Sequence, residues 1–318
     1  MSSPSIPFVC CGHVDAGKST IAGHLLQLAG QVEEHTLEMM KRKSESNKRR
    51  GCEYACLLDS LEEEQVRGQT MLFNLVDFEY QEQSYTLVDC PGHQVYVRNL
   101  LSGLNATNPA DTIGCLVVSL APGEYEAGTQ GGQTLEDLLL LRAVGIQQLI
   151  VLLNKIDAVS ADRITEVKSS IMMHVRRMGF PVVQYHEVSG YSGQGLPEFL
   201  TLLKKMHTSR KIAPTLPEPT GRTEITVRLK LLFDQSINLL FTPGLDVIMH
   251  YGSQEYQVEL VAGSLRDVNG KVIPFARNDQ VITVALRSLP AGSTMTVATG
   301  GRVLLRREQN TLAFGQVL

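Results

Sequence analysis

A glycine-rich loop stands between an apolar run and a helical pattern near the start of this chain. The run at residues 6–11, IPFVCC, has the length and character of a buried strand. GHVDAGKS at residues 12–19 follows at once and matches G-x-x-x-x-G-K-[ST], and Ile21, Leu25 and Leu28 then recur at helical spacing. A strand, a glycine loop and a helix in this order form a phosphate-binding loop, in which backbone N–H groups surround phosphate oxygens. The feature therefore predicts an α/β nucleotide-binding fold.

Further apolar runs alternate with helical patterns over the first two-thirds of the chain. The runs read as strands are YTLVD, IGCLVVSL, LIVLL and VVQYHEV, at residues 85–89, 113–120, 149–153 and 182–188. Strands that alternate with helices predict a mostly parallel sheet with helices on both faces. Ligands bind outside the carboxyl ends of the strands in such sheets. The polar motifs of this chain fall at those ends, which places the candidate site there.

The glycine-rich loop supplies the phosphate-binding part of this candidate site. The predicted residues are Gly12, His13, Val14, Asp15, Ala16, Gly17, Lys18, Ser19 and Thr20. Lys18 is expected to reach the β- and γ-phosphates, and the Ser19 hydroxyl is expected to bind Mg²⁺. The loop alone does not select the base, because ATPases share it.

Two further motifs are candidates for sensing the terminal phosphate. In DCPGH, Asp89 can hold Mg²⁺ through a water, Gly92 can turn its amide toward the γ-phosphate, and His93 would stand near the attacking water. In VRGQT, Thr70 is a candidate second hydroxyl ligand of Mg²⁺ that is in place only when the terminal phosphate is bound. The predicted catalytic residues are His93, Lys18, Thr70 and Gly92, and the predicted metal ligands are Ser19, Thr70 and Asp89.

The motifs NKID and SGY are candidates for binding the base. Their predicted binding residues are Asn154, Lys155, Asp157, Ser189, Gly190 and Tyr191. The Asp157 carboxylate can accept both the N1–H and the exocyclic amine of guanine, whereas adenine offers no matching pair of donors. A site that uses such buried hydrogen bonds rejects the wrong base by about 10⁴. All the motifs together, each at a strand end, predict a GTP-binding domain.

The charge of the chain argues against a generally basic surface made for nucleic acid, because the formal net charge is −4. One local exception is the basic run KRKSESNKRR at Lys41–Arg50. Its basic residues are Lys41, Arg42, Lys43, Lys48, Arg49 and Arg50. The run is either a solvated helical face or a contact to RNA.

The six cysteines are expected to be reduced thiols, mostly in the core of a cytoplasmic protein. Cys52 and Cys56 could meet on one helix face, but a zinc site would need two further ligands that the sequence does not place. The first residues lack a basic region and a long apolar segment, so no signal peptide is expected. No run of about 18 apolar residues occurs, and no membrane span is expected.

The sequence pattern changes after a proline-rich segment. Ile225, Val227, Leu229 and Leu231 alternate with more polar residues, and several short runs follow that are broken by Gly, Pro, Asn and Asp. This pattern predicts an all-β unit of roughly six strands closed as a small barrel. The predicted organisation is a GTP-binding domain at residues 1–210, a linker at 211–222 and a barrel at 223–318.

Several motifs together resemble one known family. GHVDAGKST, YACLLDSLEEEQVRGQT, DCPGHQVYVRNLLSG, GEYEAG, GGQT and LIVLLNKID are similar to the translational GTPases of the elongation factor 1-alpha and Tu group, whose relatives include eukaryotic release factor three and the ribosome-rescue GTPases. The resemblance implies that the chain binds GTP and GDP with Mg²⁺ and hydrolyses GTP slowly until a partner, the ribosome or a translation-associated factor, accelerates the reaction. It also implies that His93 orients water, and that Thr70, Asp89 and Gly92 are switch residues.

One residue departs from the pattern of that family. Gln69 stands where the family usually has an apolar residue, which forms a gate with the apolar residue at Val14 and restrains the histidine. A polar side chain at this position predicts weaker restraint of His93, or a histidine held by a hydrogen bond.

The barrel segment resembles the terminal barrel of the same family. GRVLLRREQNTLAFGQVL is similar to its closing strands, and KIAPTLPEPTGR leaves no room for the middle barrel. The family places the aminoacyl end of tRNA between the GTPase domain and the middle barrel, so the arrangement counts against aminoacyl-tRNA delivery. Three functions stay open: a GTPase acting on or beside the ribosome, a poorly hydrolysing nucleotide-dependent switch that engages translation-factor partners, and a GTPase subunit allied to sulfate activation.

Overall fold

The structure is a computed structural model that describes residues 4–32, 74–89, 111–130, 133–209, 217–231, 240–252, 254–307 and 310–318. The chain divides into two compact units. The first unit contains Met1–Arg142 and Ile146–Ile212, and the second contains Ala143–Gly145 and Ala213–Leu318. The predicted domain limits at residues 210 and 223 stay a prediction.

The first unit is built on a six-stranded sheet with the order β2-β3-β1-β4-β5-β6. Its strands are β1 (Ile6–Cys11), β2 (Asn74–Tyr80), β3 (Gln83–Asp89), β4 (Ile113–Ser119), β5 (Gln148–Asn154) and β6 (Val182–Val188). All neighbouring pairs are parallel except β2 and β3, which run antiparallel. Every residue of β4 and β5 is buried, as expected for central strands covered on both faces.

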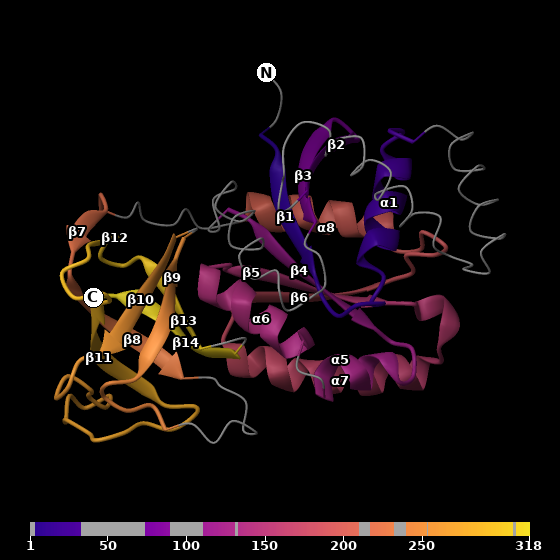
Figure 1. Ribbon diagram of the computed structural model, residues 1–318. Coiled ribbons are helices and arrows are strands. Elements are labelled where there is room, and N and C mark those ends of the chain that lie inside the picture. The colour runs from indigo at the N-terminus through magenta and orange to yellow at the C-terminus, as the bar shows by residue number, and fades with distance from the viewer. Residues whose placement is uncertain are drawn as a thin grey trace. The chain divides into compact units, whose positions relative to one another are not determined.

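Helices cover both faces of this sheet (Figure 1). They are α1 (Lys18–Leu28), α5 (Glu124–Gln130), α6 (Gln133–Val144), α7 (Ala161–Met178) and α8 (Leu196–Thr208), with a short 3₁₀ helix, η2, at Ile156–Ala158. Figure 1 shows α1 and α8 on one side of the sheet and α6 and α7 on the other. The predicted mostly parallel sheet with helices on both faces is confirmed.

An aromatic cluster fixes α8 on the sheet. The Phe8 ring of β1 meets the Phe78 ring edge-on, with centroids 6.3 Å apart, and the Phe199 ring of α8 edge-on at 5.9 Å. Phe8 and Phe199 are fully buried. Their packing holds α8 against β1.

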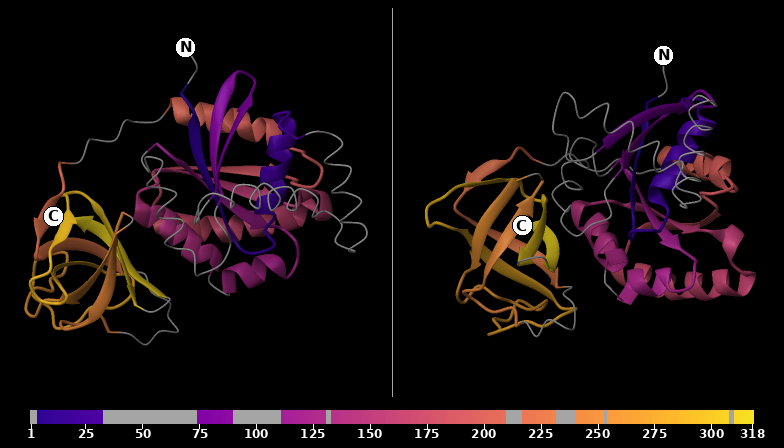
Figure 2. Two further views of the ribbon diagram at one scale, coloured as in Figure 1. Left: turned by 45° about the horizontal axis from the view of Figure 1, so that its top comes forward. Right: turned by 45° about the vertical axis from the view of Figure 1, so that its right-hand side comes forward.

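The second unit is a closed barrel in which every neighbouring pair of strands is antiparallel (Figure 2). The strand order around it is β10 (Gln254–Leu260), β11 (Val281–Ser288), β8 (Glu224–Leu231), β14 (Asn310–Val317), β13 (Arg302–Arg307) and β9 (Asp246–Tyr251). Two short strands, β7 (Thr220–Arg222) and β12 (Met295–Val297), pair beside it. Ile225, Val227, Leu229 and Leu231 of β8 all face the barrel core, so the predicted barrel is confirmed.

Candidate functional site

Two glycines let the phosphate loop close against its neighbours. Gly12 has φ +144°, and a Cβ there would lie 2.3 Å from the Val117 carbonyl oxygen of β4. Gly17 has φ +91°, and a Cβ there would lie 2.3 Å from Nδ2 of Asn154. Both positions therefore require glycine for conformation and for space. The spacing of the two glycines, read from the sequence, follows from these close approaches.

Lys18 lies inside the loop that precedes it. Its side chain is withdrawn from solvent, with the residue only 8% exposed. The Nζ atom donates to the Gly12 carbonyl at 2.7 Å and to the His13 carbonyl at 2.9 Å. These bonds fold the loop around the ammonium group and leave its charge where a phosphate would bind.

Helix α1 begins directly behind this loop. Gly17 is its N-cap, and among the described residues no side chain caps its first turn. The N–H groups of that turn are therefore available to an anion, and the helix dipole favours negative charge there. Ser19 is the second residue of α1, so its hydroxyl lies at the same end of the helix.

One buried side chain joins the three predicted nucleotide-binding motifs. Asn154, at the end of β5, is 2% exposed. Its Nδ2 donates to the Ala16 carbonyl in the phosphate loop at 2.8 Å, and its Oδ1 accepts from the Gly190 N–H in SGY at 2.8 Å. His24 of α1 also bonds the Gly190 carbonyl through Nδ1, at 3.0 Å. The phosphate loop, NKID and SGY thus form one site.

The remaining base-binding candidates lie at the rim of this site. Ser189 is fully buried, and its hydroxyl accepts from the Ser192 N–H. Asp157 is exposed, and no described residue pairs with its carboxylate. Tyr191 is 62% exposed. An acceptor and an aromatic ring are therefore open to a ligand.

Lys155 has a partner that sequence reasoning missed. Its backbone is left-handed, with φ +73°. Its Nζ donates to a Glu124 carboxylate oxygen of α5 at 2.5 Å. GEYEAG stood out in the sequence only through family resemblance, and no spacing pointed from Glu124 to Lys155, which lies 31 residues further along the chain.

A second carboxyl group missed from the sequence lies beside the phosphate loop. Burial raises the pKa of Asp137 in α6 to about 7, while the charge of Lys18 and a hydrogen bond from the Gly12 backbone act in the opposite direction. Glu136 adds to the increase. A carboxylate at this place would repel an anion bound in the glycine-rich loop.

The Asp137 carboxyl should make the stability of the first unit depend on pH. Between about pH 4 and pH 7 the folded chain holds a proton on Asp137 that the unfolded chain has lost, so stability falls as pH rises through this window. We expect the unfolding free energy of Asp137→Asn, minus that of wild type, to increase by about 2 kcal/mol from pH 5.5 to pH 8. The unfolding free energies are measured by urea titration at each pH, with helical circular dichroism as the signal. The exposed Glu198→Gln is the control, and a constant difference between Asp137→Asn and wild type would contradict the assignment.

Several predicted residues lie outside the described part of the chain. They are Thr70, Gly92, His93, Gln69 and the basic run Lys41–Arg50. β3 ends at Asp89, which pairs with Cys10 of β1. The side chain of Asp89 is also outside the described part of the chain. The roles proposed for these residues in metal binding, hydrolysis and RNA contact stay predictions. Val14, the described half of the predicted gate, is 38% exposed.

Other sequence expectations concern metals, thiols and membranes. Cys10, Cys11 and Cys115 are buried, as predicted for core thiols, and join no disulfide with a described residue, whereas Cys52 and Cys56 lie outside the described residues. Within the described ranges, no group of three or more His, Cys, Asp or Glu side chains could hold a metal ion. The described helices include none with the length and apolar character needed to cross a membrane.

The sequence matches the family described as "Elongation factor Tu GTP binding domain" over residues 3–209. It is 39% identical over 199 residues to the eukaryotic peptide chain release factor GTP-binding subunit of Dictyostelium discoideum, which covers 61% of this chain and 35% of that protein. It is also 39% identical over 202 residues to elongation factor 1-alpha of Hyperthermus butylicus, covering 61% of this chain and 45% of that protein. The chain therefore spans less than half the length of these relatives.

Solved structures with the same fold cover nearly all of the chain. The GTP-bound GTPase-like domain of Ski7 from S. cerevisiae superposes with a TM-score of 0.73 at 15% identity, covering 99% of this chain and 97% of that one. Apo elongation factor SelB from Methanococcus maripaludis gives a TM-score of 0.65 at 14% identity, covering 100% and 80%. At these identities the likeness concerns the fold alone.

Proposed function

The chain belongs to the family of the elongation factor Tu GTP-binding domain, and we propose that it binds GTP and GDP with Mg²⁺ and hydrolyses GTP to GDP and phosphate. The observation that carries the proposal is the double attachment of Asn154. Its amide holds the phosphate loop at Ala16 and the SGY segment at Gly190. A ligand that needs a phosphate site and a base site at a fixed separation fits this arrangement.

The described residues divide the binding of such a ligand between them. Lys18 and the first turn of α1 would hold the phosphates, and Lys18 would stabilise the charge that develops as the terminal phosphoryl group is transferred. The exposed Asp157 carboxylate would accept the two donors of guanine, which excludes adenine. This assignment explains why Asp157 has no protein partner among the described residues.

Mg²⁺ fits the donors that this chain offers at the phosphate site. Ser19 provides a hydroxyl oxygen at the start of α1, and oxygen donors are the ligands that Mg²⁺ prefers. Thr70 and Asp89 are proposed to complete the set. Bound Mg²⁺ would neutralise charge on the β- and γ-phosphates. His93 is proposed to orient the attacking water, with Gly92 and Thr70 responding to the terminal phosphate.

The partner is proposed from the relatives. Because these include a release factor subunit and elongation factor 1-alpha, we propose that the chain acts with the ribosome or a translation-associated factor. The barrel of the second unit is proposed to correspond to the terminal barrel of the family, with no middle barrel before it. Delivery of aminoacyl-tRNA is therefore not part of the proposal.

Nucleotide titration and single-turnover hydrolysis test the proposed function. Fluorescent GDP, GTP and ATP are titrated into the chain, and hydrolysis of radiolabelled GTP is followed with and without ribosomes. We expect guanine nucleotides to bind and ATP not to bind, with turnover that rises when ribosomes are added. Equal binding of ATP, or no nucleotide binding, would overturn the proposal. Tight GTP binding without turnover in either condition would favour the nucleotide-dependent switch.

A further inference from the structure

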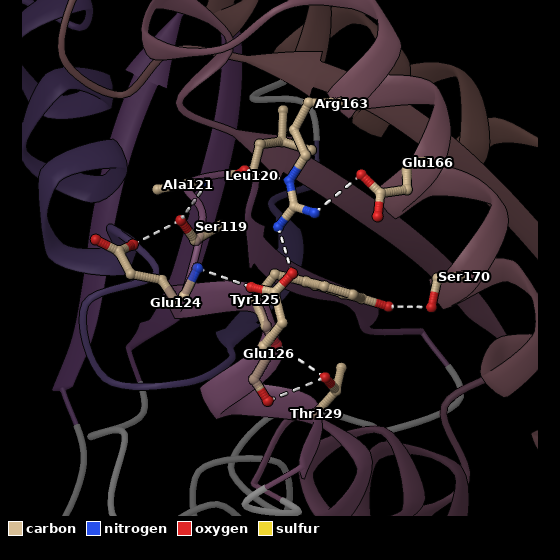
Figure 3. A network of polar contacts seen from close by, with 11 residues as sticks. Ser119, Leu120, Ala121, Glu124, Tyr125, Glu126, Thr129, Arg163, Glu166 and Ser170 are labelled. Atoms are coloured by element: carbon tan, nitrogen blue, oxygen red, sulfur yellow. Dashed lines mark hydrogen bonds and ion pairs between the residues drawn. The ribbon is translucent and has the colours of Figure 1, made fainter.

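Glu124, the first residue of α5, contacts side chains at the ends of two neighbouring strands, β4 and β5. The Glu124 carboxylate accepts a hydrogen bond from the Ser119 hydroxyl at 2.6 Å (Figure 3). The same carboxylate pairs with the Lys155 ammonium at 2.5 Å. Ser119 ends β4 and lies opposite Asn154 in the parallel register with β5. Glu124 therefore links the strand before it to the NKID loop.

The rest of α5 is fastened to α7, which keeps Glu124 in place. Arg163 pairs with Glu126 at 2.6 Å and donates to the Leu120 carbonyl at 3.2 Å, as Figure 3 shows. The Tyr125 hydroxyl bonds the Ser170 hydroxyl at 2.7 Å. The Glu124 side chain that pairs with Lys155 therefore lies on a helix that is bonded to α7.

The same segment also reaches the phosphate loop. A Cβ at Gly128 of α5 would lie 3.1 Å from Cβ of His13. Burial by itself would raise the pKa of Glu124, but hydrogen bonds from Lys155 and Ser119 outweigh it, and the pKa is lowered, with His13 contributing. Glu124 is therefore a carboxylate at neutral pH, close to both the phosphate loop and NKID.

We propose that Glu124 is a positioning residue of the guanine pocket, which acts through Lys155 by holding its ammonium group on α5 before the nucleotide binds. The inference rests on the proposed function, because Lys155 belongs to the motif that takes the base. A free lysine side chain loses much rotamer freedom when a ligand orders it. A lysine that is already paired loses less on binding, so the ligand is held more tightly.

The pair is partly exposed, with the Lys155 and Glu124 side chains 29% and 35% accessible, so its effect should be moderate. We expect Glu124→Gln to release fluorescent GDP about fivefold faster than wild type. In a Lys155→Met background, which keeps the aliphatic stem but removes the ammonium, Glu124→Gln should add no more than about 1.5-fold. This non-additivity distinguishes action through Lys155 from a general weakening of the fold.

Glu126→Gln is the matched control, because it removes a carboxylate two residues along the same helix that pairs with Arg163 instead of Lys155. The Tyr125–Ser170 and Arg163–Leu120 hydrogen bonds still hold α5 in this variant. Glu126→Gln should therefore lower the melting temperature without nucleotide but change GDP release less than about twofold. Unchanged release in Glu124→Gln would overturn the inference while leaving the proposed function standing. An equal effect of Glu124→Gln in both backgrounds would also overturn it. Failure of the wild-type chain to bind GDP would instead overturn the proposed function.

Discussion

Asp157→Asn should weaken the binding of GDP by about 10³-fold. The carboxylate offers two acceptors to the N1–H and the exocyclic amine of guanine, and hydrogen bonds to a charged group contribute about 1.5–3 kcal/mol each. The amide replaces one acceptor with a donor, which faces the exocyclic amine and cannot accept from it. Xanthine carries a carbonyl at that position, so xanthosine diphosphate should bind the variant better than GDP does. Isothermal titration with both nucleotides measures the change.

Asp162→Asn is the control for this prediction. Asp162 is also exposed, lies five residues further along the chain in the first turn of α7, and loses the same charge. It should bind GDP as wild type does. If Asp157→Asn retained both its GDP affinity and its preference among purines, the guanine site would lie elsewhere and the proposed function would lose its specificity element.

Asn154→Ala should lower GDP affinity by at least about 100-fold. The substitution removes both bonds of the amide, and it leaves the Ala16 carbonyl and the Gly190 N–H without their partner in a buried place. Each unsatisfied buried group costs about 1–3 kcal/mol. The phosphate loop and the SGY segment would then no longer be held at one separation, so the nucleotide would have to restore it on binding. Fluorescent GDP titration and thermal unfolding without nucleotide give the two readouts.

Gln148→Ala offers a matched comparison at the other end of the same strand. Gln148 is also a buried amide of β5, and its Nε2 donates to the Met206 carbonyl at 3.0 Å. Both variants should lower the melting temperature, but only Asn154→Ala should lose GDP affinity. An equal loss of affinity in the two variants would mean that Asn154 acts by stabilising the fold and not by joining the loops.

Much of the architecture followed from local patterns. The run IPFVCC was expected to be a strand and is β1, at Ile6–Cys11. Val227 and Leu229 alternate with exposed neighbours and line the barrel core, as the period of two predicts. Such patterns are readable because burial acts on each strand or helix face separately. The grouping of phosphate loop, NKID and SGY was predictable as well, because parallel strands end at one edge of the sheet.

The interactions of Glu124 and Asp137 were not predictable in the same way. Glu124 begins one helix and Asp137 lies within another, and acidic residues are common at such positions in soluble proteins. Their importance comes from groups far along the chain, Lys155 in one case and Lys18 with Gly12 in the other. The pKa of Asp137 depends on how much solvent its surroundings exclude, which no spacing in the sequence states.

The attachment of both loops to Asn154 also bears on how bound GDP could be replaced. Because a single amide secures the phosphate end and the base end of the site, the two ends are expected to open together. An exchange factor would therefore not need to open the phosphate loop and the SGY segment in separate steps. Displacing the Asn154 side chain at the end of β5 would weaken the binding of the phosphates and of the base together.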